Sequence, residues 1–575
     1  MCGIVFSLRR GTDSFPEANA SSTENVAQWK ALCELNACRG PDHRAEHVVQ
    51  LECPGGKVEL TFFSSVLHLR GKEVTKQPFV SEDGDVFCWN GEVFEGLDIG
   101  EEENDGALLF RALSAAQDPR DVFAQLEGPY AFVYLKRSAR RLYFARDPLG
   151  RRSLLKHQSE EQLLLASVGI DKVLEPEEVS PVEIHCIDLE TFVTDGLESS
   201  IDALPRHRLG AKPEWLKPQD VNAQLPSSSE ADVEDALMQQ SVKDFLDVLE
   251  ESVRLRVQHI PRMNKEGERH SRVAVLFSGG VDCTLLACLA HRCLPLEEGI
   301  DLLNVAFENP RKLGLAQQKG KKKQKPMPGK ATAGEDAADG SESLADKYAV
   351  PDRVTGLDAV QELRAVCPGR RWNFVAVNVP YDECLFHQPH VEQLMRPSDT
   401  VMDLSLANAL YFASRGSGLC QPTASSPWVP YCSPARVLLS GLGADEQLGG
   451  YSRHRRAFAR DGWAGLVAEL QMDVDRLPAR NLGRDDRVTS SWGKETRYPY
   501  LSLSLIDFLS QLPVERKVNP LLPEGEGDKR LLRLAAKSLG MRRAAGRRKR
   551  AMQFGSRSAR MGEADRKGHL RLEDI

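Results

Sequence analysis

Cysteine 2 offers the most direct chemistry in the sequence, because it follows the initiator methionine and precedes the small residue Gly3. Initiator methionine is commonly removed before small residues, so we expect Cys2 to become the first residue. An N-terminal cysteine carries a thiol nucleophile and a free α-amine on one carbon. The amine, with a reference pKa of about 7.7–8.0, can accept the thiol proton. A buried second residue that happens to be cysteine is the alternative, and Cys2 alone does not decide between them.

Polar residues within the first 110 positions could complete a catalytic site around Cys2. Asn90-Gly91-Glu92 follows an apolar run, and an Asn amide beside a backbone N–H is the chemistry of an oxyanion hole. Arg39, in Arg39-Gly40-Pro41-Asp42, can bind a carboxylate through two parallel hydrogen bonds. Glu92 and Asp105 can each bind an ammonium group. A nucleophile, an oxyanion hole and a clamp for a zwitterion together predict hydrolysis of the amide of glutamine.

Five motifs resemble those of a known family: Cys2-Gly3-Ile4, Arg39-Gly40-Pro41-Asp42, Gln77-Pro78-Phe79, Asn90-Gly91-Glu92 and Arg146-Asp147-Pro148-Leu149-Gly150. They occur in the order of the class-II, or N-terminal nucleophile, glutamine amidotransferase domain, and the resemblance covers nearly all of residues 2–190. It implies Cys2 as the nucleophile and Asn90 with Gly91 as the oxyanion hole. It also implies a glutamine-binding set of Arg39, Asn90, Gly91, Glu92 and Asp105.

A second candidate site begins at Phe277-Ser278-Gly279-Gly280-Val281-Asp282-Cys283, between a predicted strand and a predicted helix. Two glycines let backbone N–H groups approach an anion closely, and the helix adds the positive end of its dipole. Asp282 can hold Mg²⁺ on a pyrophosphate group. The Gly-Lys-Ser/Thr ending of a Walker loop is missing, so a purely structural turn stays open as an alternative.

The glycine-rich loop resembles the Ser-Gly-Gly-x-Asp-Ser loop of ATP pyrophosphatases, which adenylate a substrate and release pyrophosphate. Ser440–Glu446 and Arg497–Leu501 resemble two segments of glutamine-dependent asparagine synthetase. Val350–Gly356, Gly449–Arg455 and Lys549–Arg557 resemble the asparagine synthetase domain-containing proteins of eukaryotes, which are paralogues of the housekeeping enzyme.

The resemblance implies ATP and Mg²⁺ as cofactors, and glutamine, aspartate and ATP as small-molecule substrates. It implies Asp282 and Asp445 as candidate Mg²⁺ ligands. The implied ATP- and pyrophosphate-binding residues are Leu276, Ser278, Gly279, Gly280, Asp282, Cys283, Thr284, Val305, Ser440, Gly441 and Asp445.

Four positions depart from the synthetase pattern. Leu442 stands where synthetases carry an acidic residue proposed to assist the attack of ammonia, and leucine cannot transfer a proton. Cys283 replaces the loop serine, and Ser502 replaces an aspartate. Ala551 falls on or beside the position of a family lysine, for which Arg550 or Lys549 could substitute with different geometry. These departures favour nucleotide binding over efficient formation of asparagine.

Four functions are compatible with these residues. The first is a glutamine-dependent asparagine synthetase. The second is a glutaminase whose other domain senses nucleotide without making asparagine. The third is a pseudoenzyme scaffold that keeps its sites as binding surfaces. The fourth is an RNA-modifying pyrophosphatase, which lacks support because the sequence contains no Cys-x-x-Cys redox pair.

Composition narrows the class of protein. The chain has 575 residues, 41 % hydrophobic and 27 % charged, as in ordinary globular proteins. No apolar run reaches the ~18 residues of a membrane span, and 75 Lys and Arg against 83 Asp and Glu predict no general affinity for nucleic acid. Thirteen cysteines without metal-ligand spacing predict reduced thiols in the cytoplasm and no structural zinc.

The basic stretch Met541–Arg560 is interpreted as a solvated or phosphate-facing arm. Nuclear import through Arg547-Arg548-Lys549-Arg550 is the second option. The sequence does not fix the oligomeric state, and a homodimer stays open.

The elements that must position these residues form two domains of mixed α/β and α+β class. Residues 2–200 contain short β runs between turns, and the family resemblance implies that they form an N-terminal nucleophile αββα sandwich. A Pro- and Ser-rich linker over 201–235 precedes a parallel-sheet α/β ATP-pyrophosphatase domain over 236–575, in which strands alternate with helices. Residues 311–343 contain few large apolar side chains and predict a disordered insertion in a surface loop.

Deleting residues 311–343 should change the melting temperature little, because this segment offers too little apolar surface to offset the entropy of ordering it. Thermal unfolding of the deletion variant beside the full chain measures the shift. Strong protection of Lys321–Lys325 from proteases in the native protein would contradict this interpretation.

Overall fold

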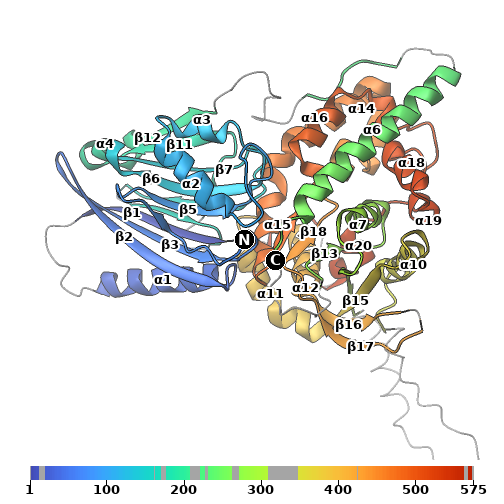
Figure 1. The fold of residues 1–575 in the computed structure, drawn as a ribbon, viewed down its shortest axis with the longest axis horizontal. Coiled ribbons are helices and arrows are strands. Elements are labelled where there is room, and N and C mark those ends of the chain that lie inside the picture. The colour runs from blue at the N-terminus through green and yellow to red at the C-terminus, as the bar shows by residue number, and fades with distance from the viewer. Residues whose placement is uncertain are drawn as a thin grey trace, which may run out of the picture.

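The structure is a computed structural model that describes residues 2–11, 20–160, 162–169, 176–206, 220–226, 231–261, 271–308, 347–423, 425–561 and 568–572. The predicted insertion over 311–343 lies outside these residues. The chain forms a sheet-rich N-terminal domain beside a larger α/β domain (Figure 1), which confirms the predicted fold class.

Two six-stranded antiparallel sheets make up the N-terminal domain, with the orders β10-β8-β9-β1-β3-β2 and β12-β11-β7-β6-β5-β4. The strands are β1 (Gly3–Gly11), β2 (His43–Cys53), β3 (Gly56–Val66), β4 (Phe79–Val80), β5 (Val86–Gly91), β6 (Tyr130–Lys136), β7 (Arg141–Arg146), β8 (Leu155–Gln158), β9 (Gln162–Ala166), β10 (Glu177–Glu178), β11 (Glu183–Asp188) and β12 (Ile201–Pro205). The helices are α1 (Ala20–Ala37), α2 (Asp105–Ala115), α3 (Pro119–Phe123), α4 (Leu189–Asp195) and α5 (Leu197–Ser200).

Alternation along the strands explains the four layers of this domain. Phe6 on β1 and Val133 on β6 point into the core between the two sheets. Their strand neighbours point outward: Val5 packs with Leu32 of α1, and Phe132 packs beneath α2 and α3. Helices therefore cover both outer sheet faces, as an αββα sandwich requires.

The segment expected to be a linker begins with ordered structure. Residues 201–205 form β12, which pairs with β11 at the edge of the second sheet. Ile201 packs against the core between the sheets, so a short edge strand lies where the composition suggested only a connection. Residues 220–226 form no helix or strand, and helix α6 already begins at residue 231.

The C-terminal domain is built on a seven-stranded sheet with the order β17-β16-β15-β14-β13-β18-β19. Its strands are β13 (Val273–Leu276), β14 (Gly299–Phe307), β15 (Arg371–Val379), β16 (Ser417–Gln421), β17 (Val429–Cys432), β18 (Val437–Leu439) and β19 (Glu495–Arg497). Its helices are α6 (Ala231–Val257), α7 (Val281–Cys293), α10 (Pro351–Val366), α11 (Tyr381–Met395), α12 (Val401–Arg415), α13 (Ala444–Gln447), α14 (Ser452–Arg480), α15 (Leu482–Ser490), α16 (Leu503–Gln511), α17 (Val514–Lys517), α18 (Arg530–Ser538), α19 (Arg542–Ala545) and α20 (Met552–Gly555).

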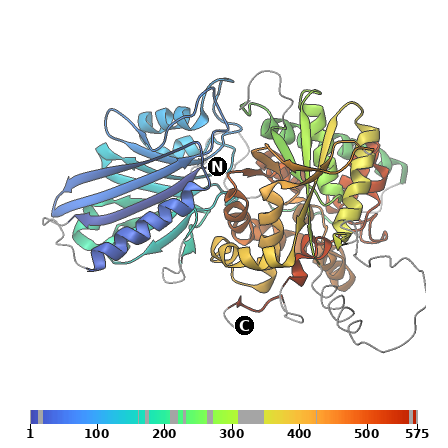
Figure 2. The ribbon, with the colours of Figure 1, turned by 90° about the horizontal axis from the view of Figure 1, so that it is seen from below.

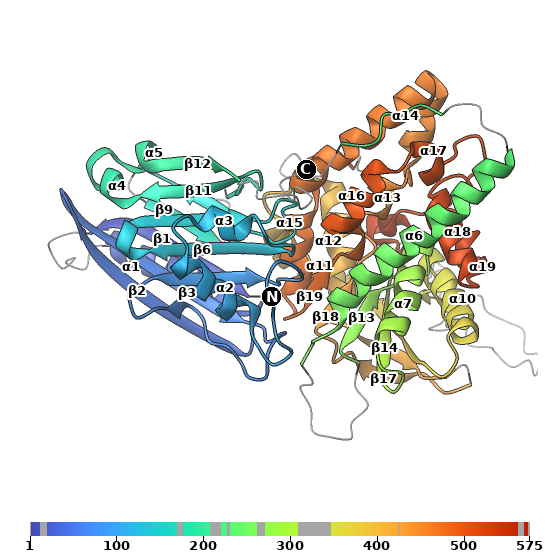
Figure 3. The same ribbon diagram turned by 45° about the horizontal axis from the view of Figure 1, so that its top comes forward.

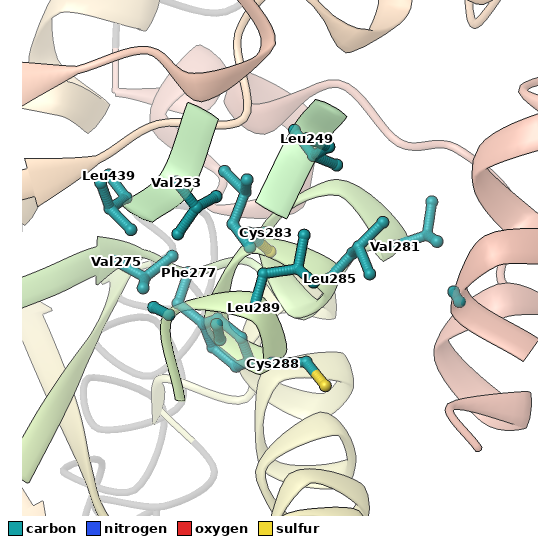
Figure 4. Packing of buried hydrophobic residues seen from close by; sticks show 14 of the residues in the cluster. Leu249, Val253, Val275, Phe277, Val281, Cys283, Leu285, Cys288, Leu289 and Leu439 are labelled. Atoms are coloured by element: carbon teal, nitrogen blue, oxygen red, sulfur yellow. The ribbon is translucent and has the colours of Figure 1, made fainter. Parts of the chain in front are cut away.

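Strands β15, β14, β13, β18 and β19 run parallel, and helices cover both faces of the sheet (Figure 2). Val275 faces the core shared with α6, α7, α10 and α18, whereas its neighbour Ala274 faces the core shared with α11 and α12. Figure 4 shows Val253 of α6, Leu285 of α7 and Val275 of β13 in the first of these cores. This packing fixes the position of α7, and with it the glycine-rich loop before it.

Within the described residues, none of the helices combines the length and hydropathy needed to cross a bilayer.

Helix α15 lies at the junction of the two domains (Figure 3), and all nine of its residues are buried. Its Asp486 accepts hydrogen bonds from Arg39 Nη2 at 2.8 Å and from the backbone N–H of Ser153 at 3.1 Å. Its Arg487 donates to Glu178 at 2.7 Å. Asp486 and Arg39 have no exposed side-chain surface. Buried charges must be paired in this way because desolvation otherwise costs several kcal/mol.

Asp486→Ala should cost about 3–5 kcal/mol in the free energy of unfolding, because it leaves the Arg39 guanidinium buried without its carboxylate. The control is Glu251→Ala, which removes the exposed partner of Arg254 on α6 and should cost about 0.5 kcal/mol or less. Urea unfolding of both variants beside the wild type measures the difference. Equal losses would contradict the importance assigned to this buried pair.

Candidate functional site

Cys2 lies at the start of β1 and contacts the end of β5. The backbone N–H of Cys2 donates to Asn90 Oδ1 at 3.0 Å, and Gln77 Nε2 lies 3.6 Å from the Cys2 Sγ. Asn90 Nδ2 is buried and lacks a hydrogen-bond partner in the described part of the chain. A buried donor beside a thiol is suited to hold a developing oxyanion.

Gly91 follows Asn90 and lies in tight surroundings. A Cβ at this position would lie 2.7 Å from the Pro129 carbonyl oxygen and 2.7 Å from the Trp89 ring, so glycine is needed there. Burial has the largest effect on the pKa of the Cys2 thiol, and it raises that pKa. The thiol is therefore protonated at rest and needs a base close by.

Arg39 contacts Cys2, but its guanidinium faces the other domain. Its Nε donates to the Cys2 carbonyl at 3.2 Å, Nη1 donates to Ser490 Oγ at 2.6 Å, and Nη2 donates to Asp486 at 2.8 Å. The side chain thus supports the backbone of the nucleophile and joins the domains. These contacts leave the predicted role as a clamp for a substrate carboxylate without structural support.

Arg70, which the sequence analysis did not single out, is the better placed cation. Its Nη1 lies 3.7 Å from Glu92 Oε2 and donates to the Val93 carbonyl at 3.3 Å. Its Nε is buried and has no hydrogen-bond partner among the described residues. Asp105 lies close enough that Arg70 lowers the pKa of its carboxyl, although burial, the larger effect, raises it.

Two carboxylates, those of Asp105 and Glu92, lie near Arg70 and have different partners. Asp105, at the start of α2, accepts the backbone N–H of Val93 through Oδ2 at 2.9 Å. Glu92 Oε1 lies 3.0 Å from Nη2 of Arg497, which belongs to the C-terminal domain. Burial raises the pKa of Glu92 to about 8, and Arg497 opposes that rise. Asp105 also accepts the backbone N–H of Gly106, so backbone donors hold Asp105, whereas guanidinium groups flank Glu92.

The glycine-rich loop lies at the carboxyl end of β13, where ligands bind in open parallel sheets. Gly279 has φ +80°, and a Cβ there would lie 2.5 Å from the backbone carbonyl of Thr355. Thr355 Oγ1 donates to the Ser278 carbonyl at 2.8 Å, which fixes the loop against α10. Helix α7 begins directly after Gly280, so its N-terminal N–H groups point at the loop.

The remaining predicted nucleotide-binding residues gather at the same edge of the sheet. Leu276 is the last residue of β13, Val305 lies two residues before the end of β14, and both contact the same apolar core. A Cβ on Gly441 would lie 3.1 Å from Cβ of Asp282. The loop after β18, which contains Ser440 and Gly441, therefore packs against the glycine-rich loop.

The two side chains that follow Asp282 on α7 point back into the fold. Thr284 Oγ1 donates to the Gly280 carbonyl at 2.7 Å, and Cys283 Sγ lies 3.3 Å from the same oxygen. Burial raises the pKa of the Cys283 thiol. Neither group points its donor at the space above the loop.

Asp282 and Asp445 converge on one lysine that the sequence analysis missed. Lys529 Nζ lies 2.7 and 2.8 Å from the two oxygens of Asp282 and 2.9 Å from Asp445 Oδ1. Lys549 also pairs with Asp445, and the two lysines hold the pKa of that carboxyl well below its usual range. Lys529 adopts φ +51° at the start of α18, an uncommon conformation for a residue with a side chain. Such outliers cluster at functional sites.

The same two carboxylates fit Mg²⁺ bound to pyrophosphate, since Mg²⁺ in nucleotide sites takes one or two carboxylates and completes its shell with phosphate and water oxygens. They converge within reach of a single Lys529 ammonium, so one cation can touch both. No cluster of three or more His, Cys, Asp or Glu side chains that could hold a metal ion occurs in the described ranges.

Leu442 lies beside this site and packs into an apolar cluster that spans the two domains. Its neighbours include Leu149 of the N-terminal domain, Leu482 of α15 and Leu501. Glu446 of the same motif is buried and accepts a hydrogen bond from the Gly443 N–H at 3.2 Å. The position that carries an acid in synthetases is here part of the domain contact.

The basic stretch Met541–Arg560 folds over the nucleotide loop. Arg547 donates to the Gly279 carbonyl and pairs with Asp358, and Lys549 pairs with Asp445. These contacts support the interpretation as a phosphate-facing arm. Lys549, rather than Ala551, brings a cation to this site.

Comparisons with known proteins agree with the division into two domains. Residues 65–171 match the family described as "Glutamine amidotransferase domain", and residues 458–571 match the family described as "Asparagine synthase". The chain is 38 % identical to the human asparagine synthetase domain-containing protein 1, over 99 % of this chain and 96 % of the human protein. It is 31 % identical to an asparagine synthetase domain-containing protein of Saccharomyces cerevisiae, over 98 % of this chain and 96 % of that protein.

Among solved structures, the glutamine phosphoribosylpyrophosphate amidotransferase of B. subtilis is 12 % identical. The match covers 56 % of this chain and 71 % of that one, with a TM-score of 0.24. This TM-score is too low to bear on the fold.

Cys2→Ala should lower glutamine hydrolysis by on the order of 10³-fold or more, because it removes the proposed nucleophile, whose backbone N–H contacts Asn90. Retaining any residue before Cys2 should have the same effect, since it blocks the amine that takes the thiol proton. Release of glutamate measures the loss.

The matched control is Cys38→Ala, which replaces an exposed cysteine and should change neither hydrolysis nor ATP binding. Unchanged glutamate production in Cys2→Ala would overturn the assignment of the nucleophile.

Proposed function

We propose that this chain, which belongs to the family of asparagine synthetase domain-containing proteins, hydrolyses glutamine at Cys2 and uses the ammonia for ATP-dependent amidation of aspartate to asparagine. The observation that carries the first half is the pairing of Cys2 with Asn90, whose Oδ1 accepts the N–H of Cys2 and whose Nδ2 stays available as a donor. One amide side chain thereby orients the amine and faces the reacting carbonyl.

In the first half-reaction, the free amine of Cys2 takes the thiol proton, and the thiolate attacks the amide carbon of glutamine. Asn90 Nδ2 and the Gly91 N–H donate hydrogen bonds to the carbonyl oxygen and stabilise the negative charge that develops on it. The amine returns the proton to the leaving nitrogen, and ammonia departs. Water then releases glutamate from the thioester.

The zwitterionic end of glutamine requires one cation and one anion. We assign its carboxylate to Arg70, whose Nε has no hydrogen-bond partner among the described residues, and its ammonium to Asp105. Glu92, whose Oε1 forms an ion pair with Arg497, then orients Arg70 and does not bind the substrate itself. This assignment replaces Arg39 in the predicted clamp.

In the second domain, the glycine-rich loop and Lys529 and Lys549 are placed to bind the phosphates of ATP. Asp282 and Asp445 would hold Mg²⁺, which when bound supplies charge neutralisation on the departing pyrophosphate. Attack of ammonia on the activated carboxyl of aspartate would release AMP and give asparagine.

A second candidate function is a glutaminase whose ATP-binding domain makes no net asparagine. The packing of Leu442 against Leu149 and Leu482 favours it, because no carboxylate occupies that position to take a proton from the attacking nitrogen. Product analysis with glutamine, aspartate and ATP separates the two functions. Asparagine, AMP and pyrophosphate in equal amounts support the first, and glutamate alone supports the second.

Leu442→Glu should raise the ammonia-dependent synthetase rate by up to about 10²–10⁴-fold, the usual worth of a positioned general base. Glutaminase turnover should stay unchanged, because Cys2 is not altered. Formation of asparagine from ammonia, aspartate and ATP measures the gain.

The matched control is Leu442→Gln, which has the shape of glutamate but cannot accept the proton, and which enters the same apolar cluster. Equal rates in the two variants would show that the missing acid does not limit synthesis. Wild-type synthesis that already equals glutaminase turnover would show the same. Because Cys283 and Ala551 also depart from the pattern, the comparison is repeated with Cys283→Ser and Ala551→Lys present.

A further inference from the structure

Arg497, the last residue of β19, reaches from the C-terminal domain into the glutamine site of the other domain. Its Nη2 lies 3.0 Å from Glu92 Oε1, and its Nε donates to Glu495 at 2.6 Å. Its Nη1 donates to the Arg256 carbonyl at 2.8 Å, and its guanidinium lies over the ring of Phe94. The side chain is 2 % exposed, so these contacts fix its position.

Glu92 also forms an ion pair with Arg70. The second oxygen of Glu92 lies 3.7 Å from Arg70 Nη1 on the side opposite Arg497. The Val93 carbonyl also accepts from Arg70, while Asp105 accepts the Val93 N–H. A buried carboxylate between two guanidinium groups therefore orients Arg70 beside Asp105.

The charge of Glu92 depends on the same arrangement. Burial, Asp105 and Glu495 raise its pKa, whereas Arg497 and Arg70 lower it, with a result of about 8. Without Arg497, the carboxyl would face two other carboxylates with one cation to balance them. It would take up a proton more readily and attract Arg70 less.

Arg497 also belongs to the nucleotide site through its backbone. Its carbonyl accepts the N–H of Ser440 at 3.0 Å, at the start of the loop that packs on Asp282. Three residues later, Tyr500 Oη donates to the Asp282 carbonyl at 3.1 Å. One short strand thus contacts both sites.

We infer that Arg497 is a positioning residue of the glutamine site, supplied by the other domain, which holds Glu92 so that Arg70 can receive the carboxylate of glutamine. The inference rests on the proposed hydrolysis of glutamine at Cys2. It makes recognition of the substrate carboxylate a property of the assembled two-domain chain.

The test compares hydrolysis of L-glutamine with hydrolysis of L-glutamine α-amide, which lacks the carboxylate. Arg497→Gln in the full chain should reduce the preference for glutamine, as a ratio of kcat/KM values, by about tenfold. The loss should lie mainly in KM, because Cys2 and Asn90 are untouched. Arg497→Lys keeps the charge and should recover part of the preference.

Glu92→Gln supplies a second route to the same loss if Arg497→Gln folds poorly. The double variant should lose no more preference than either single one, because both remove the same contact. The matched control is Arg484→Gln, which breaks another buried arginine pair on α15, with Asp485 and Asp403 of the same domain. It should lower stability and keep the preference.

Loss of preference in Arg484→Gln as well as in Arg497→Gln would indicate a loosened domain contact and overturn the inference. A preference that survives in both Arg497→Gln and Glu92→Gln would overturn it too, while the proposed function stands. A wild-type chain that hydrolyses neither substrate would overturn the proposed function and the inference together.

Discussion

The burial of charge on α15 is the constraint on which the rest of the structure depends. This helix places Arg484, Asp485, Asp486 and Arg487 between the two domains, where no water reaches them. Each charge costs several kcal/mol unless an opposite charge in good geometry compensates it. Asp486 and Arg487 pair with Arg39 and Glu178 of the N-terminal domain, so these two buried charges are compensated only when the domains are docked. Arg39, one of these partners, also donates to the carbonyl of Cys2, and the docking therefore helps to position the nucleophile.

The same junction joins the chemistry of the two sites. Glu92 belongs to the glutamine site but is held by Arg497, whose backbone contacts the loop of the nucleotide site. Beside these charges lies the apolar cluster around Leu442. At the position of Leu442, where the resemblance to synthetases implies an acid, this chain has an apolar side chain that packs at the contact between the domains. The proposed glutamine site has donors and charges in place, whereas Leu442 offers no group that transfers protons.

Local pattern predicted elements such as β5 before Asn90 and β13 before the glycine-rich loop, because alternation and turn residues act over short distances. The αββα layering was expected from the family resemblance instead. Strand β12 was missed, because a Ser- and Pro-rich segment is typical of a linker, and its composition does not show that its first residues pair with β11. The sequence does not reveal which arginine faces the substrate. Arg39 pairs with a residue 447 positions away, and Arg70 lies near Asp105, and neither relation can be inferred from spacing in the sequence.

The most direct test is a crystal structure of the full chain with Cys2 alkylated by a chloroketone analogue of glutamine, which keeps the carboxylate and ammonium of the substrate. The account predicts the carboxylate on Arg70, the ammonium on Asp105 and the ketone oxygen on Asn90 Nδ2. Arg497 should remain on Glu92, and Arg39 on Asp486. A carboxylate bound to Arg39, with its pair to Asp486 broken, would contradict the account.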